Sequence, residues 1–139
     1  MTCKAATDNF VFIANQAMRK ASEMPDDATR YMVDNIPVFA QYDVTPEMDK
    51  AGGCPGCVYL GLWADPHTAR AWGYESSEHG TIWLFERGLR SVNGDVTDKT
   101  LKTLLHEFRH ALQHDHVLDS LEKAKARGLY ATAKGGCGG

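Results

Sequence analysis

Two histidines and a glutamate stand at a spacing that could bind and activate a metal ion. His106, Glu107 and His110 lie in the sequence H-E-F-R-H. An α-helix turns about 100° per residue, so side chains four residues apart project from one face and can share one cation. Two neutral imidazoles would hold a zinc ion with a position open for water, lower the pKa of that water towards about 7, and polarise a nearby carbonyl. Glu107 would be the general base.

The residues around this motif predict a helix from about residue 98 to at least residue 112. Apolar residues recur at the spacing of a stripe that faces a core, and the two motif histidines lie nearly opposite it. The stripe consists of Leu101, Leu104, Leu105, Phe108 and Leu112. Asp95, Thr97 and Asp98 precede it, as capping and first-turn residues do at a helix N-terminus. The motif therefore belongs to an amphipathic helix.

A catalytic zinc usually takes three protein ligands, and the residues after His110 offer several for the third position. On a continuous helix, His114 would stay on the same face but about 12 Å along the axis from His106, too far to share its ion. If the helix instead ends near residue 113 and the chain turns back, His116 can reach the metal. We therefore predict His106, His110 and His116 as the ligands. The alternatives for the third ligand are, in order, Asp119 or Asp115, then Glu122.

The run H-E-F-R-H-A-L-Q-H-D-H, from His106 to His116, resembles the active-site sequence of the zincin metallopeptidases. Its ligand spacing is similar to that of metzincins and snapalysin-like enzymes. Upstream, three predicted strands precede the motif helix in the order found in the small bacterial minimal zincin proteins, and they cover residues 36–42, 58–63 and 81–87. The resemblance extends over residues 33–120. The chain departs from the pattern in having Gln113 where the family has glycine, and in lacking a Met-turn.

The resemblance implies a small single-domain α+β fold with an N-terminal helix, a short mixed or antiparallel sheet, the motif helix and a short C-terminal helix. It also implies a zinc-dependent metallopeptidase that hydrolyses peptide bonds with Glu107 as general base. In zincins the edge strand of the sheet binds the substrate backbone in antiparallel fashion, and we assign this role to strand 81–85. Candidates to stabilise an oxyanion at the metal are Tyr74, His79 and Tyr130.

A second class of function fits the same residues, namely a noncatalytic zinc-binding module that serves partner binding. The presence of Glu107 favours the enzyme, because a structural zinc site needs no base and is usually closed by four ligands. A four-ligand site completed by His114 or Asp115 would favour the module. A protease associated with DNA is disfavoured by the acidic balance of charge and the lack of a basic patch.

The length and composition predict one soluble domain. A chain of 139 residues is long enough for one core and too short for two, and we place the domain at residues 1–133 and a flexible glycine-rich tail at 134–139. The net charge of −3, with both signs well mixed, argues against nucleic-acid or anionic-membrane binding. No stretch approaches 18 apolar residues and no signal peptide is visible, so we expect a cytoplasmic protein.

The remaining segments have weaker signals. Residues 4–23 predict a helix, and residues 118–127 predict a second, charged helix. Residues 43–56 and 64–80 are expected to be long loops, with a short strand near residues 70–74.

Four cysteines stand at positions 3, 54, 57 and 137. Cys54 and Cys57 form C-P-G-C in a glycine-rich turn, which invites a redox, a metal or a disulfide interpretation. A zinc ribbon would need a second such pair, and a thioredoxin-like motif would open a helix. We therefore favour a turn that can close as a local disulfide.

Overall fold

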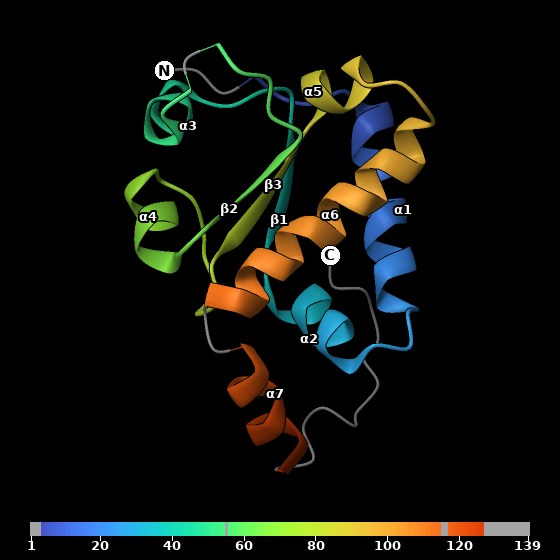
Figure 1. Cartoon of the computed structure of the whole chain (residues 1–139), viewed down its shortest axis with the longest axis vertical. Helices are drawn as coiled ribbons and strands as arrows, with labels where there is room; N and C mark the ends of the chain where they lie inside the picture. Colours follow the sequence, from blue (N-terminus) through green and yellow to red (C-terminus); the bar gives the residue numbers. More distant parts are fainter. Residues whose placement is uncertain (1–3, 55, 115–116, 127–139) are drawn as a thin grey trace.

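The structure, a computed structural model, describes residues 4–54, 56–114 and 117–126. It confirms the α+β class, with helices packed on both faces of a three-stranded mixed sheet in the described residues (Figure 1). The elements are, in chain order, α1 (Asp8–Ser22), α2 (Asp27–Asn35), β1 (Val38–Gln41), α3 (Pro46–Gly52), β2 (Gly61–Ala64), α4 (Pro66–Ala71), β3 (Thr81–Phe85), α5 (Glu86–Ser91), α6 (Val96–His114) and α7 (Val117–Ala126).

The strand β3 is the central strand of the sheet, whose order is β1-β3-β2. It pairs in parallel with β1 and in antiparallel fashion with β2. All five of its residues are buried, with Ile82 and Leu84 in the core on one face and Trp83 and Phe85 in the core on the other. The prediction that strand 81–85 is an edge strand is therefore wrong. Its nearly continuous apolar run is typical of a strand covered on both faces.

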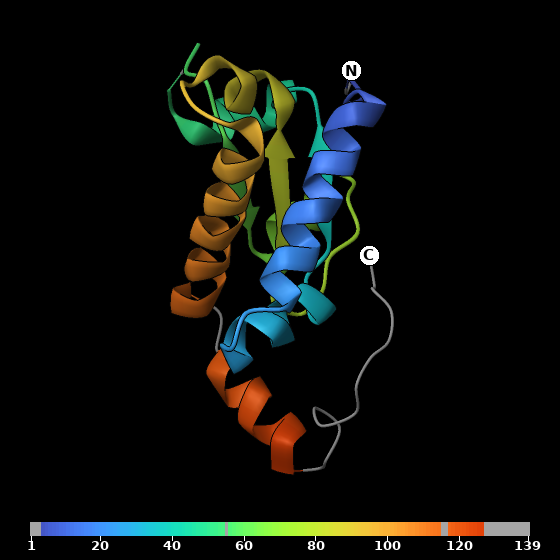
Figure 2. The same ribbon diagram turned by 90° about the vertical axis from the view of Figure 1, so that its right-hand side faces the viewer.

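Two cores lie on opposite faces of the sheet. On one face, α6 crosses β2 and β3 while α1 lies alongside α6 (Figures 1 and 2). Phe10 of α1 and Leu104 and Phe108 of α6 fill the larger core there. The smaller core, on the other face, contains Met48 of α3 and Ala69 of α4. The sheet thus presents one face to the motif helix and the other to the short helices.

Short helices replace parts of the predicted loops. The helix α3 begins after Thr45, whose hydroxyl accepts a hydrogen bond from the backbone N–H of Met48 (3.3 Å). The helix α4 begins after Asp65, whose carboxylate accepts from the backbone N–H of Thr68 (2.7 Å). In both cases a proline follows the capping residue, and this pair is a helix-start signal. The predicted strand near residues 70–74 is therefore wrong. The helix α2 is not among the predicted elements; Asp26 caps it by accepting a hydrogen bond from the backbone N–H of Thr29 (3.3 Å).

The helices predicted at the two ends of the fold are confirmed with shifted bounds. The first, α1, begins at Asp8 because the Thr7 hydroxyl caps it by accepting from the backbone N–H of Phe10 (3.2 Å). The last, α7, matches the charged helix. In the segment between α3 and β2, a disulfide joins Cys54 and Cys57, as predicted.

The predicted tail 134–139 lies outside the described residues. Within the described part of the chain, no helix is long and apolar enough to cross a membrane.

Candidate metal centre

The helix α6 carries the H-E-F-R-H motif as the sequence predicts. It runs over 19 residues, and the Asp95 carboxylate at its start accepts from the backbone N–H of Thr97 (3.2 Å). Phe108 is buried in the larger core, whereas His106 is exposed and His110 is half-buried. The apolar stripe anchors the helix on the sheet, so the two histidines face away from the core.

The two imidazoles converge. The Nε2 atoms of His106 and His110 lie 3.2 Å apart, and the rings stand edge to face at an interplanar angle of 89°. Two nitrogens that each lie about 2.0 Å from one tetrahedral zinc ion are about 3.3 Å apart. The separation of these donors therefore fits two ligands of a single zinc ion.

His110 is held in the form that binds metal. Burial lowers the pKa of its imidazole, and the positive charges that His106, His114 and Arg109 can carry lower it further. A lowered pKa favours the neutral ring at pH 7, and only the neutral ring has a lone pair free for a metal ion.

Glu107, which follows His106 in the helix, is buried, with only 6% of its surface exposed. Burial raises the pKa of its carboxyl to about 7, because the charged form loses its contact with water. A group with a pKa near the pH of the medium exchanges protons efficiently, so this carboxyl is suited to general acid–base catalysis.

Gly61 explains how β2 comes close to the motif helix. A Cβ at this position would lie 2.6 Å from Cγ2 of Thr103, 3.1 Å from the carbonyl oxygen of Trp83 and 3.2 Å from Cγ of Glu107. Only glycine fits this contact, which buries Glu107 under the strand. No role for Gly61 is predicted from the sequence. The sequence does contain a signal for it, because a glycine inside an apolar strand often marks the close approach of another backbone.

His114 extends the row of histidines along the same helix face. Its ring stacks on that of His110 at 6.1 Å between centroids and on that of Trp63 at 5.9 Å. The prediction that His114 stays on the face of His106 and His110 on a continuous helix is confirmed. The His114 ring lies against that of His110 and not between His106 and His110.

The third ligand is not found in the described part of the chain, where no group of three or more His, Cys, Asp or Glu could hold a metal ion. Asp119 and Glu122 lie on α7, where both are exposed. The preferred residue, His116, and Asp115 lie outside the described residues. The helix α6 is described as far as His114, so the turn of the chain that would bring His116 to the metal stays a prediction.

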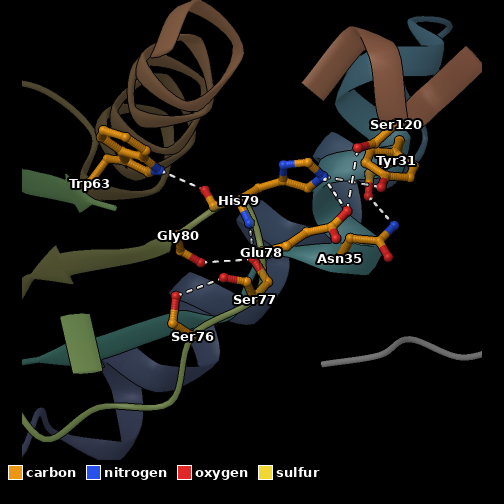
Figure 3. Close-up of polar contacts among 9 residues, drawn as sticks. All are labelled: Tyr31, Asn35, Trp63, Ser76, Ser77, Glu78, His79, Gly80 and Ser120. Atoms are coloured by element: carbon orange, nitrogen blue, oxygen red, sulfur yellow. Dashed lines mark hydrogen bonds and ion pairs between the residues drawn. The ribbon is translucent and has the colours of Figure 1, made fainter. Parts of the chain in front are cut away.

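The candidate oxyanion stabilisers are not brought to the pair. Tyr74 donates to Oε1 of Gln41 (2.9 Å) and packs in the smaller core, on the face of the sheet opposite α6. The His79 ring is buried against Tyr31 (Figure 3). Tyr130 lies outside the described residues. The proposed roles of Tyr74 and His79 are therefore wrong, because their side chains face other partners.

The chain is similar in structure to a solved protein. The chain matches no protein-family model and no curated protein. A conserved hypothetical protein from Thermo thermophilus is similar in structure, with a TM-score of 0.49 and 24% sequence identity. The match covers 76% of this chain and 92% of the other.

Proposed function

We propose that this protein is a zinc-dependent peptidase of the zincin type. The observation that carries the proposal is the convergence of the His106 and His110 Nε2 atoms at 3.2 Å on a helix in which Glu107, the residue after His106, is buried. A structural metal site has no use for a buried acid next to its ligands, whereas a hydrolase needs a base at that place.

Each side chain of the site has its own role in the proposed hydrolysis. His106 and His110 would hold the zinc, with His116 as the proposed third ligand. A bound zinc ion would lower the pKa of a water molecule and polarise the substrate carbonyl. Glu107 removes a proton from the attacking water and returns it to the leaving amine. In the metal-free chain, burial raises the pKa of this carboxyl to about 7, so that both its charged and its neutral form are accessible near neutral pH.

We assign substrate binding to the edge of β2 that faces away from β3, in place of strand 81–85. The backbone N–H of Phe85 donates to the carbonyl of Leu60 (3.0 Å), so these two residues form a hydrogen-bonded pair of the antiparallel ladder. Such pairs alternate with non-bonded ones, and the N–H and C=O groups of Gly61 and Trp63 therefore point away from β3. An extended peptide could add to this edge as a further strand.

Binding at the edge of β2 would also bring the substrate close to Glu107. Gly61 contacts both the motif helix and Glu107, so a peptide paired with its backbone would lie next to the catalytic carboxyl. The substrate class is thus a peptide or protein segment that can adopt an extended conformation.

The first test is the metal content of the purified protein, measured by elemental analysis, together with its hydrolysis of a mixture of unstructured peptides followed by mass spectrometry. We expect one zinc per chain and its loss in His106→Ala and His110→Ala. Glu107→Gln should keep the zinc and lose hydrolysis by about a hundredfold or more, since it lacks the base.

Asp98→Asn is the matched control, because it makes the same carboxylate-to-amide change at an exposed position of the same helix. It should keep both zinc and activity. Hydrolysis by Glu107→Gln at the parental rate would overturn the mechanism. Stoichiometric zinc without hydrolysis of any peptide would instead favour the noncatalytic zinc-binding module.

A further inference from the structure

A second cluster of polar contacts lies in residues 76–80, which we call the polar turn (Figure 3). Ser77 and Gly80 exchange two backbone hydrogen bonds (3.3 and 3.2 Å), and the Ser77 hydroxyl donates to the Gly80 carbonyl (2.9 Å). Gly80 has a φ of +95°, and a Cβ there would lie 2.3 Å from the carbonyl oxygen of Ala64. The turn is therefore held in one conformation against the end of β2.

His79 fixes the polar turn to α2. Its side chain is only 3% exposed, and its Nε2 atom lies 3.2 Å from the Tyr31 hydroxyl and 3.2 Å from Oε2 of Glu78. Buried polar groups are costly unless they are paired, and this pairing therefore resists displacement of the turn.

The polar turn also contacts the motif helix through Trp63. The indole Nε1 of Trp63 donates to the backbone carbonyl of His79 (2.9 Å). The Trp63 ring stacks on His114, the last residue of α6, with an interplanar angle of 24°. The His114 ring in turn stacks on His110 with an angle of 15°. A continuous series of contacts thus joins the turn to one histidine of the candidate metal pair.

The other side of the polar turn contacts α7. Oε2 of Glu78 accepts a hydrogen bond from the hydroxyl of Ser120 (3.3 Å). The first residue of α7, Val117, is fully buried in the larger core and follows His114 by three positions. The turn therefore contacts α7 directly and is linked to the last described turn of α6 through Trp63.

We propose that Glu78 and His79 are positioning residues for the metal centre. By fixing the turn whose backbone binds Trp63, they hold Trp63 against His114 and His114 against His110, and so set the orientation of the His110 ring toward the bound zinc. This inference rests on the proposed function. Residues that orient metal ligands typically change metal affinity by about 10- to 100-fold when they are replaced.

The test is the zinc affinity of the purified protein, measured by competition with a chromophoric chelator, and the visible absorption spectrum of the protein loaded with cobalt(II). The variants are Glu78→Ala and Trp63→Phe. Glu78 is 72% exposed, so its loss should leave the fold intact. Phenylalanine keeps a ring beside His114 but lacks the indole donor. We expect each variant to bind zinc about tenfold more weakly and to shift the cobalt spectrum, since ligand geometry changes.

Two further variants separate positioning from general stability. Ser76→Ala removes a hydrogen bond that stays within the polar turn, from the Ser76 hydroxyl to the carbonyl of Ser77 (2.9 Å), and should leave the cobalt spectrum unchanged. Glu78→Gln keeps an oxygen that can accept from Ser120 and should recover most of the affinity lost in Glu78→Ala.

Unchanged affinity and spectrum in both Glu78→Ala and Trp63→Phe would overturn the inference while the proposed function stands. A lower melting temperature with an unchanged cobalt spectrum would also overturn it, because the role would then be purely structural. A parent protein that binds neither zinc nor cobalt would overturn the inference and the proposed function together.

Discussion

Replacing Glu107 with glutamine should change how the stability of the metal-free protein depends on pH. Burial raises the pKa of this carboxyl from its ordinary value of 4.5 to about 7 in the folded protein. The folded chain therefore holds the proton more tightly than the unfolded chain does. The stabilising contribution of the protonated carboxyl is fully present below pH 4.5 and is lost as the pH rises through about 7.

The magnitude follows from the difference between the two pKa values. At about 1.4 kcal/mol per pKa unit, a rise from 4.5 to about 7 corresponds to about 3 kcal/mol. The side chain is only 6% exposed, so little of this effect should be screened by solvent. Glutamine has nearly the same shape and carries no charge, and Glu107→Gln should therefore lack this loss. We expect the stability of the variant relative to the parent to increase by about 3 kcal/mol between pH 4.5 and 8.

The assay is urea unfolding followed by circular dichroism at several pH values between 4.5 and 8, with a chelator present to keep the protein free of metal. The comparison with the parent cancels the other groups that titrate in this range. Leu104→Ala is the control, because it removes buried surface and no charge, and its difference from the parent should be the same at every pH. A stability difference between Glu107→Gln and the parent that stays constant over this range would refute the argument that Glu107 is buried and protonated near neutral pH.

Three further predictions concern the free energy of unfolding of the protein and its variants. Gly61→Ala should lower the free energy of unfolding by about 1–3 kcal/mol in urea titrations, because the new Cβ would overlap Thr103; no loss would show that β2 can move away from the helix. Zinc at a hundredfold excess over its Kd should stabilise the parent by about 2.7 kcal/mol in calorimetry, and a similar gain in His110→Ala would contradict the proposed site. Leu104→Ala should cost about 2–5 kcal/mol, whereas Leu118→Ala, at a position 54% exposed, should change stability by about 0.5 kcal/mol or less.

The sequence by itself determined the motif helix and the pair of histidines on it. The i, i+4 spacing of His106 and His110 fixes both side chains on one helix face, and the leucine stripe opposite them turns that face away from the core. These are local properties, because helix geometry is the same wherever the helix lies. The terminal helices α1 and α7 were predictable for the same reason.

Only the tertiary structure decided which of the strands under the motif helix is the edge of the sheet. The apolar run of β3 suited a central strand and an edge strand equally well, since residue types that favour strands do not tell whether a strand pairs on one side or on both. The position of β2 at the sheet edge depends on pairing between residues far apart in the chain, and its contact with α6 depends on the missing side chain of Gly61. The pKa of Glu107 follows from that same contact, because desolvation is produced by the elements that cover a group and not by its neighbours in sequence.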